Sequence, residues 1–291
     1  MRGGSDKMKY LILGANGMAG HMISTYLIEK GYDVTTLTKS PYLVGKNIIL
    51  DVRDFGQLKS IIHQDFDVII NAIGLLNRSV DDYLSDAILI NSYLPHFLQD
   101  QTKNTNTKVI HLSTDCVFSG LTGSYKETSL KDGLSYYAMT KNLGEISGSK
   151  DLTIRTSIIG PDINPSGIGL FNWFMKQKQP IKGYERAIWT GVTTLTLAKA
   201  IEVASQNEVS GLYHLVNSET ISKYDLLQLF NQYFKASSLH ISKDDQYHCD
   251  KSLVCTRKDF VFDVPSYEQM IIEMKQWIDE HHELYPHYFD K

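Results

Sequence analysis

Two periods of apolar residues alternate along the chain from Lys9 onward: short runs of apolar, often β-branched residues, and longer segments with helical spacing. The short runs predict strands at residues 9–13, 32–38, 47–50, 67–72, 108–113 and 152–159. The longer segments predict helices at residues 18–30, 54–63, 83–102 and from about 135 onward. This order predicts a Rossmann-like α/β fold, a doubly wound parallel sheet with helices on both faces.

After Pro161 the pattern loosens into a loop, an amphipathic segment at 170–177, and a helix and strand at 192–205 and 211–216 that return to the sheet. Amphipathic helices are predicted at 222–234 and 267–281. We therefore expect residues 8–165 and about 190–217 to form an NAD(P)-binding Rossmann domain. Residues of about 166–189 and 218–291 would form a smaller, mixed C-terminal substrate lobe. Residues 1–7 are expected to be a remnant of cloning before Met8.

The composition of the chain excludes several classes of binding partner and structural site. Apolar residues make up 42% of the chain and charged residues 21%, and the formal charge of -4 offers no basic surface for nucleic acid or anionic membrane. No apolar run reaches the roughly 20 residues of a membrane span. Three cysteines without C-x-x-C spacing argue against a disulfide framework and a zinc site. A cytoplasmic protein with a small-molecule ligand is predicted, and a homodimer is left open.

The stretch "ILGANGMAGH" places Gly14, Gly17 and Gly20 between the first strand and the first helix. Glycines there let the backbone turn tightly and approach a pyrophosphate, which the helix N-terminus also attracts. Gly14, Asn16 and Gly17 are therefore predicted cofactor contacts, although a glycine turn can also be purely structural.

The second strand ends in Thr38, Lys39 and Ser40, where an NAD-preferring site usually has an acidic residue. A cation flanked by two hydroxyls suits the 2′-phosphate of NADPH, with NADH as the alternative cofactor. For Lys39 alone, a solvated loop lysine is an equal interpretation. Asp51 and Val52, after the third strand, are predicted to flank the adenine.

Tyr-x-x-x-Lys, which sets a phenol and an ammonium one helical turn apart, occurs four times. The pairs are Tyr26/Lys30, Tyr42/Lys46, Tyr137/Lys141 and Tyr247/Lys251. Only Tyr137/Lys141 follows a strand that ends at the ligand-binding edge of the predicted sheet. The other three are expected on the first helix, in a loop and in the distal lobe, away from the reaction.

That strand ends "HLSTDCVFSG" and delivers Ser113, Thr114 and Asp115 to the carboxyl edge of the sheet, where Ser113 is a predicted cofactor contact. A Lys141 cation is expected to lower the pKa of Tyr137 from its free value near 10. Tyr137 would then protonate a carbonyl oxygen as hydride reaches the carbon, while the Thr114 hydroxyl holds that oxygen. The alternative is a helix-surface pair beside a strand-end cap.

The motifs "GANGMAG", "NAIG", "STDCVFSG", "YAMTK" and "IRTSIIG" resemble those of extended short-chain dehydrogenases/reductases, in particular dTDP-4-dehydrorhamnose reductases and related nucleotide-sugar reductases. The resemblance runs from Met8 almost to the end of the chain. It implies reduction of a nucleotide-linked 4-keto-6-deoxy sugar for cell-surface polysaccharide. It implies substrate contacts at Thr114 and Asp115, and cofactor contacts at Gly17, Met18, Ala19, Asp51, Val52, Ala72, Ile73, Gly74, Tyr137 and Lys141.

Departures from the family limit the choice of sugar. Ile158 replaces an aromatic contact to the sugar nucleotide, and "CDKSL" replaces an Arg-Pro signature. An acidic residue that binds a dimer-bridging magnesium in some members is Met22 here, so no metal is predicted.

Other polar residues have structural interpretations. Asn71 and Asn91 are expected to fix the backbone near the cofactor, His111 to be a satisfied core histidine and Cys116 to pack. Two rival functions remain. An NAD-retaining sugar-nucleotide epimerase or dehydratase shares the fold, although the compared dehydratases have Glu where Cys116 stands. A non-catalytic NADP-binding subunit, resembling the regulatory subunit of methionine adenosyltransferase, is the second.

Overall fold

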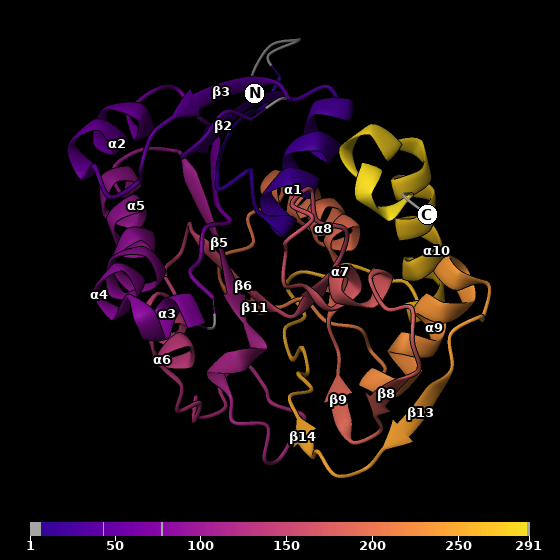
Figure 1. Ribbon diagram of the computed structural model, residues 1–291. Coiled ribbons are helices and arrows are strands. Elements are labelled where there is room, and N and C mark those ends of the chain that lie inside the picture. Colours follow the sequence, from indigo (N-terminus) through magenta and orange to yellow (C-terminus); the bar gives the residue numbers. More distant parts are fainter. Residues whose placement is uncertain (1–6, 43, 77, 290–291) are drawn as a thin grey trace.

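The computed structural model describes residues 7–42, 44–76 and 78–289 (Figure 1). The expected cloning remnant at residues 1–7 therefore lies, except for Lys7, outside the described residues. Within them, seven parallel strands form a sheet in the order β11-β6-β5-β4-β1-β2-β3. The strands are β1 (Lys9–Leu13), β2 (Asp33–Thr38), β3 (Lys46–Ile49), β4 (Val68–Asn71), β5 (Lys108–Thr114), β6 (Leu152–Thr156) and β11 (Gly211–His214). The predicted doubly wound α/β fold is confirmed.

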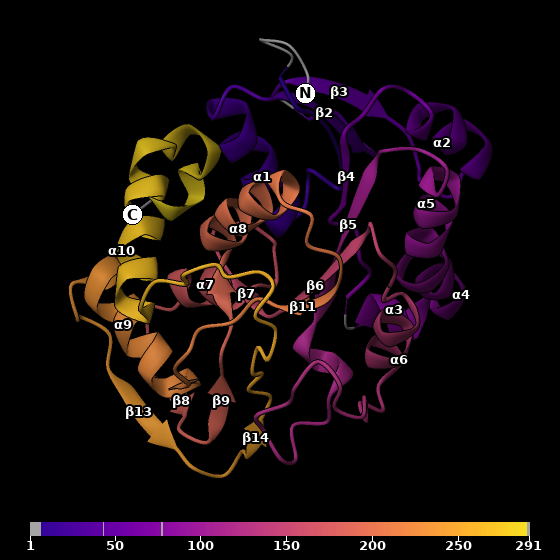
Figure 2. The ribbon, with the colours of Figure 1, turned by 180° about the vertical axis from the view of Figure 1, so that it is seen from behind.

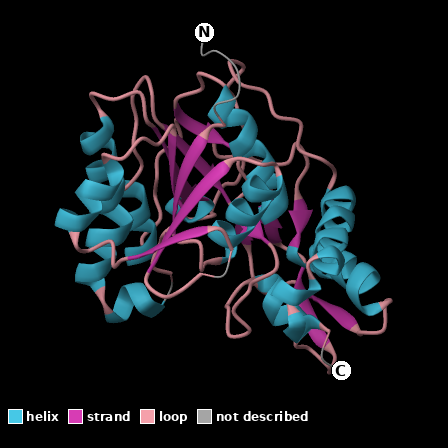
Figure 3. Ribbon diagram, turned by 90° about the horizontal axis from the view of Figure 1, so that it is seen from above, coloured by secondary structure: helices cyan, strands magenta, loops and turns pink. Residues whose placement is uncertain are grey.

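Alternate residues of β1 face opposite cores, as the two-residue period of a strand requires. Tyr10 and Ile12 face the core under α1 (Met18–Glu29) and α8 (Thr194–Gln206). Leu11 and Leu13 face a second core under α2 (Phe55–Ile62) and α5 (Leu94–Thr102). The two helical layers flank the strands in the view from above (Figure 3).

The predicted helix at 83–102 contains an irregular turn. It is divided into α4 (Leu84–Ala87), a π-helical turn at Ile88–Tyr93, and α5. Pro95 has no N–H to donate to the Asn91 carbonyl one turn earlier, so the α-helical ladder is interrupted there. Gly144 packs against that carbonyl so closely that a Cβ would lie 1.9 Å from it. The turn thus brings α6 (Tyr136–Leu143), which precedes Gly144, beside Asn91.

Segments on both sides of β11 build a lobe beside the sheet (Figure 2). Its helices are α7 (Leu170–Met175), α9 (Lys223–Lys235) and α10 (Tyr267–Glu280). The sequence pattern missed its strands, which have two to four residues each and pair over long sequence distances, except that β7 lies at the end of the predicted run 152–159. They are β7 (Ile158–Ile159), β8 (Ile181–Tyr184), β9 (Ala187–Trp189), β10 (Val192–Thr193), β12 (Ile221–Ser222), β13 (Ile241–Asp244) and β14 (Cys249–Asp250).

The lobe shares its core with the sheet. Phe171 of α7, Phe230 of α9 and Met274 of α10 belong to the same buried cluster as Ile12 and Ile110. Lobe and sheet are therefore packed as one body, and the predicted domain boundaries stay a prediction. Among the described helices, none is both long and apolar enough to cross a membrane.

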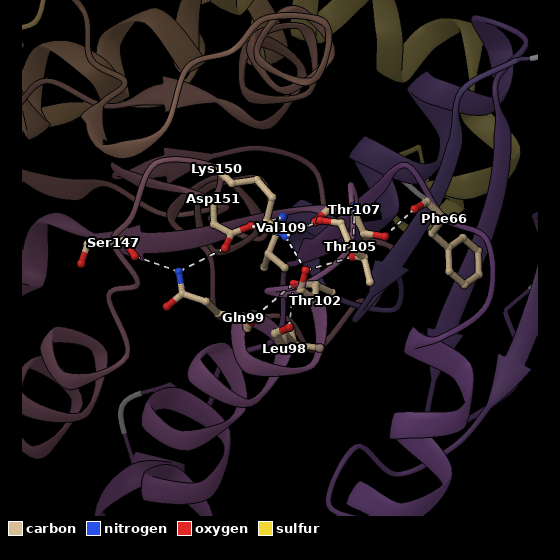
Figure 4. A network of polar contacts seen from close by, with 10 residues as sticks. All are labelled: Phe66, Leu98, Gln99, Thr102, Thr105, Thr107, Val109, Ser147, Lys150 and Asp151. Atoms are coloured by element: carbon tan, nitrogen blue, oxygen red, sulfur yellow. Dashed lines mark hydrogen bonds and ion pairs between the residues drawn. The ribbon is translucent and has the colours of Figure 1, made fainter. Parts of the chain in front are cut away.

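Polar contacts tie the sheet together at the amino ends of β5 and β6, opposite the ligand-binding edge (Figure 4). Lys150 Nζ donates to the carbonyls of Thr102 (2.6 Å) and Thr107 (2.7 Å). Asp151 accepts from the Val109 backbone N–H (2.8 Å) and from Gln99 (3.1 Å). These contacts fix the register in which β5 presents its carboxyl end.

Candidate active site

The glycine loop between β1 and α1 is held by close backbone contacts. Gly14 has a φ of 89°, and a Cβ there would lie 2.7 Å from Ile73 Cγ1. A Cβ on Gly20 would lie 2.2 Å from the Gly14 carbonyl oxygen. Gly17 precedes α1 without a side-chain cap, so the first N–H groups of α1 are not satisfied by a cap. The loop suits the pyrophosphate of a dinucleotide, which a helix N-terminus attracts.

The loop is joined to the segment after β2. Asn16 Nδ2 donates to the Ser40 hydroxyl (2.9 Å) and carbonyl (3.2 Å), and the Thr38 hydroxyl donates to the same carbonyl (2.7 Å). The predicted cofactor hydroxyls of Thr38 and Ser40 are therefore engaged within the protein, where they shape the turn.

The charged residues near this turn include one that the sequence analysis missed. Lys39 Nζ lies 3.2 Å from the Asp51 carboxylate, and Arg53 binds both Asp51 (2.6 Å) and Asp86 (2.8 Å). Hydrogen bonds from Arg53, supported by Lys39, hold the pKa of Asp51 well below its usual range. Two cations, Lys39 and Arg53, thus flank Asp51 beside this turn. Val52 is buried in the core.

Asn71 and Asn91 fix the segment after β4, as predicted from sequence. Asn71 Oδ1 accepts from the Ile73 N–H (3.2 Å). Asn91 bonds both backbone groups of Leu75 (2.8 and 3.0 Å) and the Thr140 hydroxyl (3.2 Å). The predicted cofactor segment from Ala72 to Gly74 is thereby held beside the glycine loop.

The end of β5 and the start of α6 come together. Thr114 caps the short turn Asp115–Val117 by accepting from the Cys116 N–H (3.1 Å), and its hydroxyl donates to the Asp115 carboxylate (3.1 Å). Tyr137 adjoins this turn. Burial raises the pKa of Tyr137, electrostatic interactions with Cys116 and Asp115 raise it further, and a hydrogen bond with the Thr114 hydroxyl opposes them. The predicted Thr114, Asp115 and Tyr137 are thus grouped at one sheet edge.

The expected lowering of the Tyr137 pKa by Lys141 is wrong for this structure, because the dominant effect on Tyr137 is burial. Lys141 is itself buried, and its Nζ donates to the Leu112 carbonyl (2.7 Å) and contacts His111 Nε2 (3.2 Å). Burial lowers the pKa of Lys141 to about 8. His111 also contacts Asn71 through its other ring nitrogen (3.2 Å), as expected of a satisfied core histidine.

Ser113, predicted to contact the cofactor, is bound to a buried ion pair. Its hydroxyl donates to Glu145 (2.7 Å), whose carboxylate receives two hydrogen bonds from Arg155 (2.8 and 2.7 Å). Arg155 Nη1 also contacts His214 Nε2 (2.8 Å). The pair joins β6 to the end of α6 and supports the strand end that carries Thr114. No spacing pattern in the chain predicted this ion pair.

A cavity of about 480 Å³ opens between this edge and the lobe. Asp115, Cys116 and Ser157 line it on the sheet side. Ile158 is not among the lining residues; it pairs with Val192 beside the cavity, and a substrate contact there stays a prediction.

One prediction about the Tyr-x-x-x-Lys pairs is wrong, as the residues on the lobe side of the cavity show. Tyr247 and Lys251, which were expected to lie away from the reaction, line this cavity together with Cys249. Within the described part of the chain, no group of three or more His, Cys, Asp or Glu side chains is arranged to hold a metal ion.

A doubly wound sheet, a glycine loop at its first crossover, and Thr114 beside Tyr137 at the end of β5 define an extended short-chain dehydrogenase/reductase. Residues 8–251 match the family described as "RmlD substrate binding domain", and the chain belongs to this family. The predicted resemblance is confirmed, and with it an oxidoreductase of the nucleotide-sugar reductase type.

Named relatives agree with this assignment. The spore coat polysaccharide biosynthesis protein SpsK of Bacillus subtilis is 26% identical over 226 residues, covering 75% of this chain and 76% of SpsK. The dTDP-4-dehydrorhamnose reductase of Salmonella typhimurium is 31% identical over 217 residues, covering 66% of this chain and 72% of that enzyme. The dTDP-4-dehydrorhamnose reductase of Bacillus anthracis, solved with NADP, shares the fold with a TM-score of 0.80 at 18% identity, covering 94% of this chain and 100% of that one.

Proposed function

We propose that the protein is an NADPH-dependent reductase of a nucleotide-linked 4-keto-6-deoxy sugar, acting in the synthesis of cell-surface polysaccharide sugars. The observation that carries the proposal is the grouping of Thr114, Asp115 and Tyr137 beside a cavity of about 480 Å³. The names of the Salmonella reductase and of SpsK support the reaction and the pathway.

The glycine loop fits a dinucleotide, because Gly20 lets α1 pack directly on the loop and leaves the uncapped N-terminus of α1 beside it. In the proposal Gly14, Asn16, Gly17, Met18 and Ala19 hold the pyrophosphate. The structure solved with NADP supports this cofactor, with NADH as the alternative. Further contacts are assigned to Thr38, Lys39, Ser40, Asp51, Val52, Ala72, Ile73, Gly74, Ser113, Tyr137 and Lys141.

Lys39 and Arg53 together favour NADPH over NADH. Both are partly exposed cations on either side of Asp51, and a 2′-phosphate can accept charge-assisted bonds from them.

NADPH would supply the hydride that reaches the carbonyl carbon of the sugar. Tyr137 donates its phenolic proton to the carbonyl oxygen, so the C=O bond becomes CH–OH. Because burial raises the Tyr137 pKa, the phenol holds its proton until negative charge develops on that oxygen. The Thr114 hydroxyl orients the oxygen, and Lys141, held by the Leu112 carbonyl, supplies a cation on the same helix as Tyr137.

The residue at position 116, a cysteine, argues against the alternative function as a dehydratase. Elimination requires a base beside the strand-end threonine, and burial raises the pKa of the Cys116 thiol to about 11. A thiol that stays protonated at neutral pH is a poor base. The reductase is therefore the better-supported function.

The test follows NADPH absorbance with a panel of dTDP- and UDP-linked 4-keto-6-deoxy sugars. The purified protein should carry no nicotinamide and should oxidise NADPH in proportion to the sugar supplied. Turnover of a sugar nucleotide without net NADPH oxidation would instead indicate an epimerase or dehydratase. No turnover on the whole panel, with recovery of a partner enzyme in a pull-down, would indicate a regulatory subunit.

A further inference from the structure

Three lysines from separate segments of the lobe line the cavity beside the reaction centre. Lys182 comes from β8, Lys223 is the first residue of α9 and Lys251 follows β14. Asp115 is the one carboxylate among the described residues that line the cavity. Three lysines against one carboxylate give the lining a net formal charge of +2.

Two of these lysines already have partners. Lys182 is mostly exposed, and its Nζ lies 3.9 Å from Asp244. Lys251 interacts with Cys116 and with the Asp115 carboxylate, and these interactions outweigh burial and raise its pKa.

Lys223 forms neither an ion pair nor a side-chain hydrogen bond within the described residues. Its Nζ lies 4.5 Å from the centre of the Trp189 ring, and among the described residues no hydrogen-bond acceptor contacts it. Burial lowers the pKa of Lys223 to about 8 against the attraction of Asp115 and two cysteines. A cation held over a buried indole and left without an acceptor is suited to an anionic ligand.

Lys223 lines the cavity together with residues of the reaction edge and with two tyrosines of the lobe. Its charge interacts with Asp115 and Cys116 of the reaction edge. The rings of Tyr184 and Tyr247, which line the same cavity, lie 5.0 Å apart and are about half exposed. An anion bound at Lys223 would therefore share the cavity with a group beside Asp115 and with a planar group on the tyrosines.

We propose that Lys223 determines substrate specificity by binding the diphosphate of a nucleotide sugar, with the sugar toward Asp115 and the base toward Tyr184 and Tyr247. The inference rests on the proposed function for the identity of the ligand. The two negative charges of a diphosphate diester match the net charge of the lining. Lys is suited to phosphate as a point charge that needs no fixed bidentate geometry.

The test is calorimetric titration of the NADP⁺-saturated protein with thymidine diphosphate, uridine diphosphate, and the uncharged nucleosides thymidine and uridine. In Lys223→Gln, affinity for the diphosphate that wild type binds should fall about 10- to 100-fold, as expected for loss of a charge-assisted contact, while nucleoside affinity stays the same. Lys223→Arg should recover most of the affinity. Lys243→Gln is the matched control, because Lys243 lies in the same lobe, outside the cavity, and pairs with Glu185.

Three results would overturn the proposal: no binding of either diphosphate to wild type, a Lys223→Gln affinity within about twofold of wild type, or equal losses for nucleoside and diphosphate. The proposed function can fail separately. Lys223-dependent diphosphate binding without NADPH oxidation would leave this inference standing and refute the reductase. NADPH oxidation with a sugar nucleotide, together with an unchanged diphosphate affinity of the Lys223→Gln variant, would support the reductase and refute the role of Lys223.

Discussion

The buried pair between Glu145 and Arg155 gives the sharpest prediction about stability. Arg155 is fully buried, Glu145 is 5% exposed, and two hydrogen bonds of 2.8 and 2.7 Å join them. Glu145→Gln keeps the shape of the side chain but removes its charge and turns an NH₂ group toward Arg155 or Ser113. The guanidinium is then buried without a counter-charge.

The expected loss of unfolding free energy is about 3–5 kcal/mol, the range for breaking a buried ion pair on one side. Loss of one charge-assisted hydrogen bond alone accounts for roughly 1.5–3 kcal/mol of it. Since 1 kcal/mol shifts the melting temperature of a chain somewhat smaller than this one by roughly 2–4 °C, a decrease on the order of 10 °C is predicted.

Urea and thermal unfolding, followed by circular dichroism at pH 7, measure this loss. Burial alone would raise the pKa of Glu145, but Arg155 and Ser113 outweigh it and the pKa is lowered. The Glu145 carboxylate therefore stabilises the folded protein fully above its unfolded pKa of about 4.3. This stabilisation is lost as the pH falls through the lower folded pKa of Glu145, so the unfolding free energies of variant and wild type should converge there.

Glu185→Gln is the control, because Glu185 pairs with Lys243 where both side chains are exposed. Exposed pairs contribute about 0–1 kcal/mol, so this variant should unfold almost as wild type does. A loss below about 1 kcal/mol in Glu145→Gln would refute the argument that Arg155 depends on Glu145 for its burial.

Three further predictions concern the cofactor edge. Tyr137→Phe should reduce turnover by about 10²- to 10⁴-fold while the NADPH dissociation constant, measured by fluorescence titration, stays within about twofold; turnover close to wild type would show that Tyr137 is not the acid. Gly20→Ala should weaken NADPH binding in the same titration, because its Cβ would lie 2.2 Å from the Gly14 carbonyl oxygen, whereas Gly56→Ala, with its closest contact at 3.5 Å, should bind normally. His21 is buried and its pKa is lowered to about 4, so protons bind the unfolded chain more readily and the melting temperature should fall from pH 6.5 to pH 5. The decrease of the melting temperature between pH 6.5 and pH 5 should be smaller in His21→Gln than in wild type. An identical decrease would contradict the lowered pKa of His21.

The sheet was predictable because each of its strands carries its own periodic signal. In β1, Tyr10 and Ile12 alternate with Leu11 and Leu13, and this local pattern already specifies a strand buried on both faces. The lobe strands were not predictable, because two to four residues are too few to show a period. Their partners, such as Ile188 of β9 and Asp250 of β14, lie far apart in the chain.

Residues of the candidate site could be predicted from sequence where they lie at the end of a strand or on the helix that follows it. Thr114 and Asp115 come from β5, and Tyr137 from the helix that packs beside it. Lys223 and Arg53 gave no such signal, because their positions depend on tertiary packing of the lobe and of the charged turn. The same reason explains Tyr247 and Lys251: their pattern was visible, but the fold of the lobe decides that they line the cavity.

The interpretation of the Tyr137/Lys141 pair was wrong about the pKa of Tyr137. Four-residue spacing puts Lys141 on the same helix face, but it does not determine where the ammonium points. The structure directs it to the Leu112 carbonyl, and burial then dominates the pKa of Tyr137.

The measurement that tests the central claim most directly is isotope transfer from NADPH in which both hydrogens at C4 of the nicotinamide ring are deuterium. With the nucleotide-linked 4-keto-6-deoxy sugar that supports turnover, one deuterium should appear at C4 of the sugar product for each NADPH oxidised. A product without deuterium, or NADPH oxidation without a reduced sugar, would contradict the assignment of this protein as a nucleotide-sugar reductase.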